Sequence, residues 1–255
     1  SEMCIRDSNM HCAGPTCSPS RAGLLTGMNP HSAGMIGLAH RGFALRDVRT
    51  HIVHTLHQAG YTSMLCGIQH VMPTSAAIGY SEVLTDRHAA VFPTVIERLG
   101  RPMPEPFFLD VGLFETHRPF PAAADDQDPR YQPATGILPD TPDMRQDVAA
   151  YNTMARVLDQ KVGLVLEALD QAGLAGRTIV IITTDHGPAF PLMKCNLTAQ
   201  GTGVLFMMRG PGIPAGTVSD VLLSQIDVFP TLCDLLDFPK PSWLEGRSFA
   251  AVAQD

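Results

Sequence analysis

The chain has little charge and few aromatic side chains, and it lacks the long runs that mark several classes of protein. Of its 255 residues, 17% are charged and 6% aromatic, with one tryptophan. The formal net charge is −7 and no block of Lys or Arg occurs, which argues against a nucleic-acid-binding surface. No apolar run approaches the length that spans a membrane. An anionic ligand would therefore need a local positive site, made by a metal and a few basic side chains.

Cysteine occurs at six positions, but neither metal-site spacing nor a disulfide framework is present. These positions are Cys4, Cys12, Cys17, Cys66, Cys195 and Cys233. The pattern leaves the redox compartment open.

Length and hydropathy patterning indicate one large α/β domain. Short apolar runs predict four strands, at 61–66, 107–114, 178–183 and 204–208. Apolar residues at helical spacing predict helices over 47–59, over 151–169 and over 226–236, the last interrupted early by Pro230. Strands that alternate with helices predict a mostly parallel central sheet with helices on both faces. The proline-rich segment 119–142 is expected to be a surface excursion that rims a site.

Residues 1–8 have neither apolar periodicity nor an initial methionine. They read as the translation of a sequencing-library adapter joined to a truncated gene, with a disordered natural terminus as the alternative. We exclude them from the predicted fold.

The run Cys17-Ser18-Pro19-Ser20-Arg21, followed by Leu24-Leu25-Thr26-Gly27, is the most informative stretch. A turn residue before proline predicts a helix start, and Gly27 predicts its end. Cys17 would then lie at the helix N-terminus, where free N–H groups favour an anion, with Arg21 on the same face. This suits a nucleophile that attacks an anionic ester. The alternative is a buried thiol.

Polar clusters follow three of the predicted strands. They are Gly67-Ile68-Gln69-His70, Glu115-Thr116-His117-Arg118 and Asp185-His186-Gly187. Ligands of open α/β sheets bind beyond the carboxyl ends of the strands, so these clusters are candidate site residues. Asp185 is well placed to hold a hard divalent cation, although strand-end aspartates often serve as caps.

The Cys17 run resembles the signature of type I sulfatases, C-x-P-S-R followed by L-x-T-G, and Thr184-Asp185-His186-Gly187 resembles a metal motif of that family. The resemblance implies an alkaline-phosphatase-like fold and a formylglycine made from Cys17 by a formylglycine-generating enzyme. Sulfatases usually begin with a strand that ends in paired aspartates and close with a C-terminal subdomain. We therefore expect residues 9–255 to be an incomplete catalytic domain that lacks both. The pair Asp125-Asp126 is expected to lie in a solvated loop.

The resemblance also implies a role for each site residue. A hydroxyl of the hydrated formylglycine at position 17 would attack sulfur, and Arg21 would hold this hydrate and balance its charge. His70 would take a proton as sulfate leaves, His117 would protonate the leaving group, and Lys194 would hold a sulfate oxygen. Asp185, His186 and residue 17 would bind the metal, expected to be calcium, with another divalent ion as the alternative. Ile68 stands where the family commonly has a lysine. Either Lys194, Arg118 or another residue would substitute for that lysine, or the substrate would differ somewhat from that of other members.

Segments 187–197 and 29–35 resemble the heparan N-sulfatase branch, which implies hydrolysis of a sulfate ester or N-sulfate on a sugar. Scaffold turns shared by many sulfatases would explain the same similarity. Two other functions stay open: a phosphonate or phosphate monoester hydrolase of the same superfamily, and a non-catalytic glycan-binding relative. We expect residues 1–255 alone to be inactive because two carboxylates of the metal site are missing. No nucleic-acid or membrane partner is expected, and family members are usually periplasmic, lysosomal or secreted.

Overall fold

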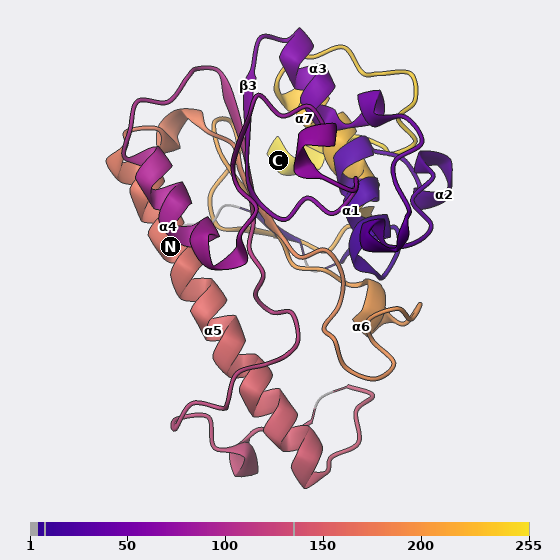
Figure 1. The fold of residues 1–255 in the computed structure, drawn as a ribbon, viewed down its shortest axis with the longest axis vertical. Coiled ribbons are helices and arrows are strands. Elements are labelled where there is room, and N and C mark those ends of the chain that lie inside the picture. Colours follow the sequence, from indigo (N-terminus) through magenta and orange to yellow (C-terminus); the bar gives the residue numbers. More distant parts are fainter. Residues whose placement is uncertain (1–4, 8, 135, 255) are drawn as a thin grey trace.

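The computed structural model describes residues 5–7, 9–134 and 136–254 (Figure 1). Its α-helices are α1 Cys17–Thr26, α2 Pro30–Ala33, α3 Ile52–Gln58, α4 His88–Leu99, α5 Pro142–Gln171, α6 Ala199–Thr202, α7 Val228–Leu235 and α8 Ala250–Gln254. Its strands are β1 Ile5–Asp7, β2 Met10–His11, β3 Thr62–Gly67, β4 Glu82–Thr85, β5 Phe107–Gly112, β6 Val180–Thr183, β7 Phe206–Arg209, β8 Thr217–Ser219 and β9 Leu223–Ser224.

The strands form separate sheets rather than one continuous sheet within the described residues. Strand β3 lies between β4 and β5 and is parallel to both, with Cys66 opposite Val111. Strands β6, β7, β1 and β8 form a second sheet in that order, and β2 pairs with β9. The expected α/β class with parallel strands is confirmed. The β6–β7 and β1–β7 pairs are antiparallel, which the alternation of strands and helices did not indicate.

Helices α1, α3 and α7 enclose one apolar core, and their labels lie together in Figure 1. Ala22, Val53 and Phe229 supply one fully buried side chain from each of these helices. A second core, which includes Phe206 and Met208 of β7, lies against the sheet that holds β6. Helix α1 is thus held by tertiary packing on most of its surface, and this fixes the position of its first residue.

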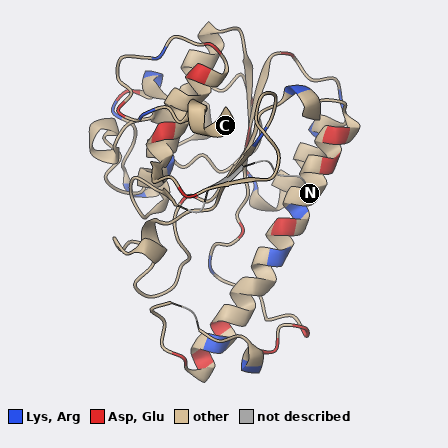
Figure 2. Ribbon diagram, turned by 180° about the vertical axis from the view of Figure 1, so that it is seen from behind, with Lys and Arg blue, Asp and Glu red and all other residues tan. Residues whose placement is uncertain are grey.

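Helix α5 is 30 residues long, and its N-terminal half projects beyond the rest of the molecule together with the segments 119–134 and 136–141 (Figure 1). Acidic and basic residues are interspersed along this helix (Figure 2). None of the helices in the described ranges is both long and apolar enough to cross a membrane. The pair Asp125-Asp126 lies exposed in this projection, as predicted, and Asp126 forms an ion pair with Arg156 of α5.

Three local expectations differ from the structure. Helix α1 begins at Cys17, so Pro19 is its third residue rather than its first. Helix α7 runs through Pro230, because a proline in the first turn gives up no intrahelical hydrogen bond. Residues Ile5–Asp7, for which no element was predicted, pair with β7 and β8 as strand β1.

Candidate active site

Helix α1 presents Cys17 as its first residue. Thr16 precedes it in an extended conformation, and Gly27 ends the helix in the left-handed region at φ 66°. Glycine adopts that conformation without a steric cost, which explains the predicted stop. Cys17 is buried, and the free N–H groups of the first turn surround it with positive potential.

The chain that follows β6 brings Asp185 and His186 to the start of α1. The same chain then packs closely against α6 at Gly187, where a Cβ would lie 1.8 Å from the carbonyl oxygen of Gln200. The backbone N–H of His186 donates to Oδ1 of Asp185 at 3.1 Å. Any other residue at position 187 would force this loop away from α6 and so shift the neighbouring Asp185 and His186.

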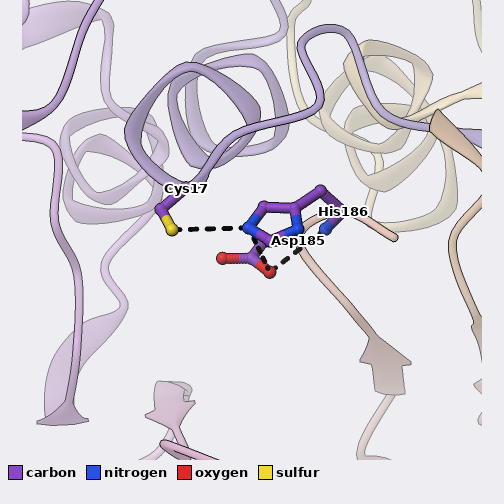
Figure 3. Close-up of side chains that lie close together, drawn as sticks. All are labelled: Cys17, Asp185 and His186. Carbon is purple, nitrogen blue, oxygen red and sulfur yellow. Dashed lines mark hydrogen bonds and ion pairs between the residues drawn. The ribbon is translucent and has the colours of Figure 1, made fainter. Parts of the chain in front are cut away.

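Cys17, Asp185 and His186 point their polar atoms at one common point (Figure 3). Sγ of Cys17 lies 3.3 Å from Nε2 of His186, and that nitrogen lies 3.6 Å from Oδ1 of Asp185. One ligand atom from each of the three residues lies within 4.8 Å of the other two. Thiol, imidazole and carboxylate are the donors that divalent metals take in proteins, so the cluster fits such an ion.

The hydrogen bond made by Nδ1 of His186 shows that Nε2 is the nitrogen free to bind a metal. Nδ1 lies 2.7 Å from the carbonyl oxygen of Gly187, and a carbonyl can only accept. Nδ1 therefore carries the proton, and Nε2 of the neutral ring directs its lone pair at Cys17 and Asp185. Burial lowers the pKa of His186, although Asp185 acts in the opposite direction. A neutral imidazole oriented by a backbone carbonyl is the usual arrangement of a metal-binding histidine.

Arg21 lies one turn after Cys17 and holds Asp185. Its Nε donates to Oδ2 of Asp185 at 3.2 Å, and its Nη1 donates to the carbonyl oxygen of Ile68 at 2.9 Å. Burial alone would raise the pKa of Asp185, but the charge and hydrogen bond of Arg21, with contributions from His186 and Lys194, outweigh it and leave the pKa below its ordinary value. Asp185 is therefore a carboxylate at neutral pH. Because Arg21 spans Asp185 and Ile68, it joins α1 to the ends of β6 and β3.

His70 lies within electrostatic reach of Asp185 and Arg21, in a loop that Gln69 organises. Oε1 of Gln69 accepts from the backbone N–H groups of Val71 at 2.7 Å and Met72 at 3.1 Å. His70 adopts a left-handed φ of 56° at this turn. Its pKa is lowered first by burial and then by the charge of Arg21, with smaller contributions from the neighbouring His40 and from Lys194. His70 is thus a neutral imidazole close to the charged residues of the site.

A family model described as Sulfatase matches residues 1–238. The chain belongs to the sulfatase family. Among curated relatives, human N-sulphoglucosamine sulphohydrolase is 32% identical over 272 residues, which cover 89% of this chain and 53% of that protein. The chain thus spans about half the length of this relative.

Solved structures share the sulfatase fold over the whole chain. One, from work on glycosaminoglycan metabolism by Bacteroides thetaiotaomicron, superposes with a TM-score of 0.81 at 23% identity and covers 100% of this chain and 68% of that one. A phosphonate monoester hydrolase from Silicibacter pomeroyi superposes with a TM-score of 0.73 at 18% identity, over 98% of this chain and 70% of that one. At these identities the likeness shows the fold.

Lys194 and His117, the other two residues predicted for the site, lie in different surroundings. Lys194 acts electrostatically on His70, Asp185 and His186, and has no ion-pair partner within the described part of the chain. His117 is exposed, and its Nδ1 donates to the carbonyl oxygen of Arg118 at 2.6 Å. Its ring lies against Phe114, at a centroid distance of 4.9 Å. No contact in the described residues links His117 to Cys17, so its role stays a prediction.

Arg118 is occupied by structural contacts. Its guanidinium forms an ion pair with Asp147 of α5 and donates from Nε to the carbonyl oxygen of Ala189 at 2.7 Å. It also lies 4.2 Å from the ring centre of Phe120. These contacts join the projection to the loop after β6. Of the two replacements suggested for the lysine that Ile68 displaces, only Lys194 is therefore an unpaired cation near Asp185.

Sequence reasoning missed Gln225 and its contact with Ser20, which connects α1 to the end of β6. Oε1 of the fully buried Gln225 lies 2.8 Å from Oγ of Ser20, and its Nε2 donates to the carbonyl oxygen of Thr184 at 2.7 Å. The Ser20 hydroxyl also contacts the backbone oxygen of Asp185. The serine belonged to the recognised motif, but nothing local marks Gln225, which lies 205 residues further along the chain.

Proposed function

We propose that this chain carries the catalytic centre of a sulfatase that hydrolyses sulfate esters or N-sulfates on sugars, with Cys17 converted to formylglycine. The observation that carries the proposal is the meeting of Cys17, Asp185 and His186 at the N-terminus of α1. A helix N-terminus and an adjacent arginine favour an anion at that point. Family membership supports the same chemistry.

A divalent metal would be held by residue 17, Asp185 and Nε2 of His186, and it would neutralise charge on the sulfate oxygens. We propose calcium for the converted chain, because formylglycine places oxygen where the thiol stood, and calcium prefers oxygen ligands. Before conversion the donors are sulfur, nitrogen and oxygen, a set that suits zinc and other borderline metals. The identity of the bound ion should therefore depend on the state of residue 17.

The other site residues have electrostatic and proton-transfer roles in this proposal. Arg21 holds Asp185 ionised and in place, so its first task is electrostatic. Lys194, as the unpaired cation, would contact a sulfate oxygen. His70, which is neutral, can take up the proton released as sulfate is expelled. We assign protonation of the leaving group to His117, in agreement with the family resemblance, which requires it to turn from its present contact with Arg118.

The substrate proposal rests on the relative that shares 32% identity, whose name specifies N-sulphoglucosamine. We propose a sulfated amino sugar, with the sulfate on nitrogen or oxygen. The formylglycine-generating enzyme is the proposed maturation partner.

Two measurements test this function. The chain is expressed with a formylglycine-generating enzyme, and mass spectrometry of the peptide that contains residue 17 should show the loss expected for thiol-to-aldehyde conversion. Sulfate release from N-sulfated and O-sulfated glucosamine is then measured for residues 1–255 and for any longer product of the same gene, with Cys17→Ala as the control. Conversion without sulfate release in any preparation would refute the proposal.

A phosphonate or phosphate monoester hydrolase is the second candidate function. The fold shared with the phosphonate monoester hydrolase from Silicibacter pomeroyi is the observation that favours it. The same preparations are assayed with phenyl sulfate, phenyl phosphate and a phenyl phosphonate. Faster release from the phosphorus esters would favour this alternative. An unmodified thiol beside a converted control sulfatase would favour a non-catalytic glycan-binding relative.

A further inference from the structure

His40, which no pattern in the sequence marked, makes a hydrogen bond to His70. Nδ1 of His40 lies 3.0 Å from Nε2 of His70. The two ring planes differ by 4° and their centres are 5.3 Å apart. A ring nitrogen lies about 1.1 Å from the centre of its imidazole. The two rings therefore lie in one plane and meet head-on, with both nitrogens close to the line between the centres.

This head-on geometry indicates a hydrogen bond rather than a metal site. In a linear N–H···N bond the lone pair of one nitrogen points at the other, as it does here. Two ligands of one metal ion instead direct their lone pairs at a third point off the line that joins them. One proton is therefore shared between His40 and His70.

Both histidines are held in place by the backbone of the site. His40 belongs to the 3₁₀ turn Ala39–Arg41, and the N–H of Ala39 donates to Oγ of Ser18 in α1 at 3.0 Å. The segment after this turn is joined to the residue after His70, because the N–H of Leu45 donates to the carbonyl oxygen of Val71 at 3.2 Å. The pair is thus anchored to the same helix that begins with Cys17.

We propose that His40 is a positioning residue for His70: it accepts a hydrogen bond from Nε2–H of His70 and leaves Nδ1 of His70 as the nitrogen that takes up a proton. The inference rests on the proposed function, in which His70 is the base. Nδ1 of His70 has no hydrogen-bond partner among the described residues. Nε2 of His40 is likewise without a partner there and its side chain is exposed, so its own N–H can face water.

The opposite direction of the bond would prevent His70 from acting as a base. If His40 donated, Nε2 of His70 would be the acceptor, and uptake of a proton on that nitrogen would break the bond. With His70 as donor, the proton goes to Nδ1, and Nε2–H continues to donate to His40 in both states. The ring then keeps its orientation while its charge changes. Arg21 from α1, Asp185 after β6 and Lys194 are the other charged groups that act on His70.

Nitrogen NMR of the chain labelled with ¹⁵N-histidine tests the pair without reference to activity. In the wild type we expect Nε2 of His70 to carry the proton above neutral pH, Nδ1 to be unprotonated, and a coupling across the hydrogen bond to Nδ1 of His40. Signals are assigned by their loss in His70→Asn. A protonated Nδ1 of His70 in the neutral ring, or no coupling to His40, would overturn the proposal.

Variants separate positioning from a general structural effect. His40→Phe should abolish the coupling and give His70 a mixture of tautomers, whereas His40→Asn supplies a carbonyl acceptor and should keep the Nε2–H form. His31→Phe, at an exposed histidine of α2, is the matched control and should leave the His70 signals unchanged. Unaltered His70 signals in His40→Phe would also contradict the proposal.

Activity provides a second readout in any preparation that releases sulfate. A general base contributes about 10²–10⁴-fold, so we expect His40→Phe to lower kcat by about tenfold or more, with rescue by His40→Asn. Failure of every preparation to release sulfate would refute the proposed function, while the NMR result would still decide the His40–His70 pair. Full activity of His40→Phe beside an active wild type would refute the positioning role.

Discussion

His51 should make the stability of this sulfatase fall at mildly acidic pH. The side chain is fully buried, and Nε2 has no partner within the described ranges. Its Nδ1 accepts from the N–H of Val53 at 3.3 Å and so caps helix α3. Burial, with a smaller contribution from His54, lowers the pKa of His51 from 6.5 to about 3.

The sign of the effect follows from the two states of the chain. Between about pH 3 and 6.5, unfolded His51 binds a proton that folded His51 does not, so its contribution to stability is complete above 6.5 and decreases as pH falls. Each pH unit below 6.5 lowers the free energy of unfolding by about 1.4 kcal/mol. At about pH 5 the free energy of unfolding is therefore about 2 kcal/mol lower than at neutral pH.

The assay is urea unfolding of the wild type and His51→Asn at about pH 7.5 and 5. Asparagine can still accept from Val53 but does not titrate. The cavity left by the smaller side chain lowers the free energy of unfolding equally at both pH values, so this effect cancels in the comparison. We expect the wild type to lose about 2 kcal/mol more than the variant between the two pH values, and His31→Asn to behave as the wild type. Equal pH dependence in the wild type and His51→Asn would refute the reasoning.

Two further predictions concern the contacts around Cys17. Gln225→Leu should lower the free energy of unfolding by about 2–4 kcal/mol, because it removes buried hydrogen bonds between α1 and the end of β6. Urea titration should show a change below about 0.5 kcal/mol for Gln171→Leu at the exposed end of α5, and similar losses in both would contradict the assignment. The unconverted chain should bind Co²⁺ with a sulfur-to-metal charge-transfer band. Cys17→Ser should abolish that band and Cys195→Ser should retain it, so a band that survives in Cys17→Ser would place the metal elsewhere.

The short motifs were predictable because each is a local property of the chain. Helix α1 and its end at Gly27 follow from turn chemistry that neighbouring residues decide. Strands β3, β5 and β6 were found because each contains a short, mostly apolar run. Helix α4, with Pro93 inside it, was not predicted, and the packing of Val91 and Val95 in the core with Cys66 is what holds it.

The sequence by itself determined the family, the helix that has Cys17 at its N-terminus, and the identity of the residues that meet there, Asp185 and His186. Only the tertiary structure decided which of the other candidates join them. It pairs Arg118 with Asp147 and links His40 to His70. The physical reason is that a hydrogen bond or ion pair between distant segments depends on how whole elements pack, which no pattern of neighbouring residues records.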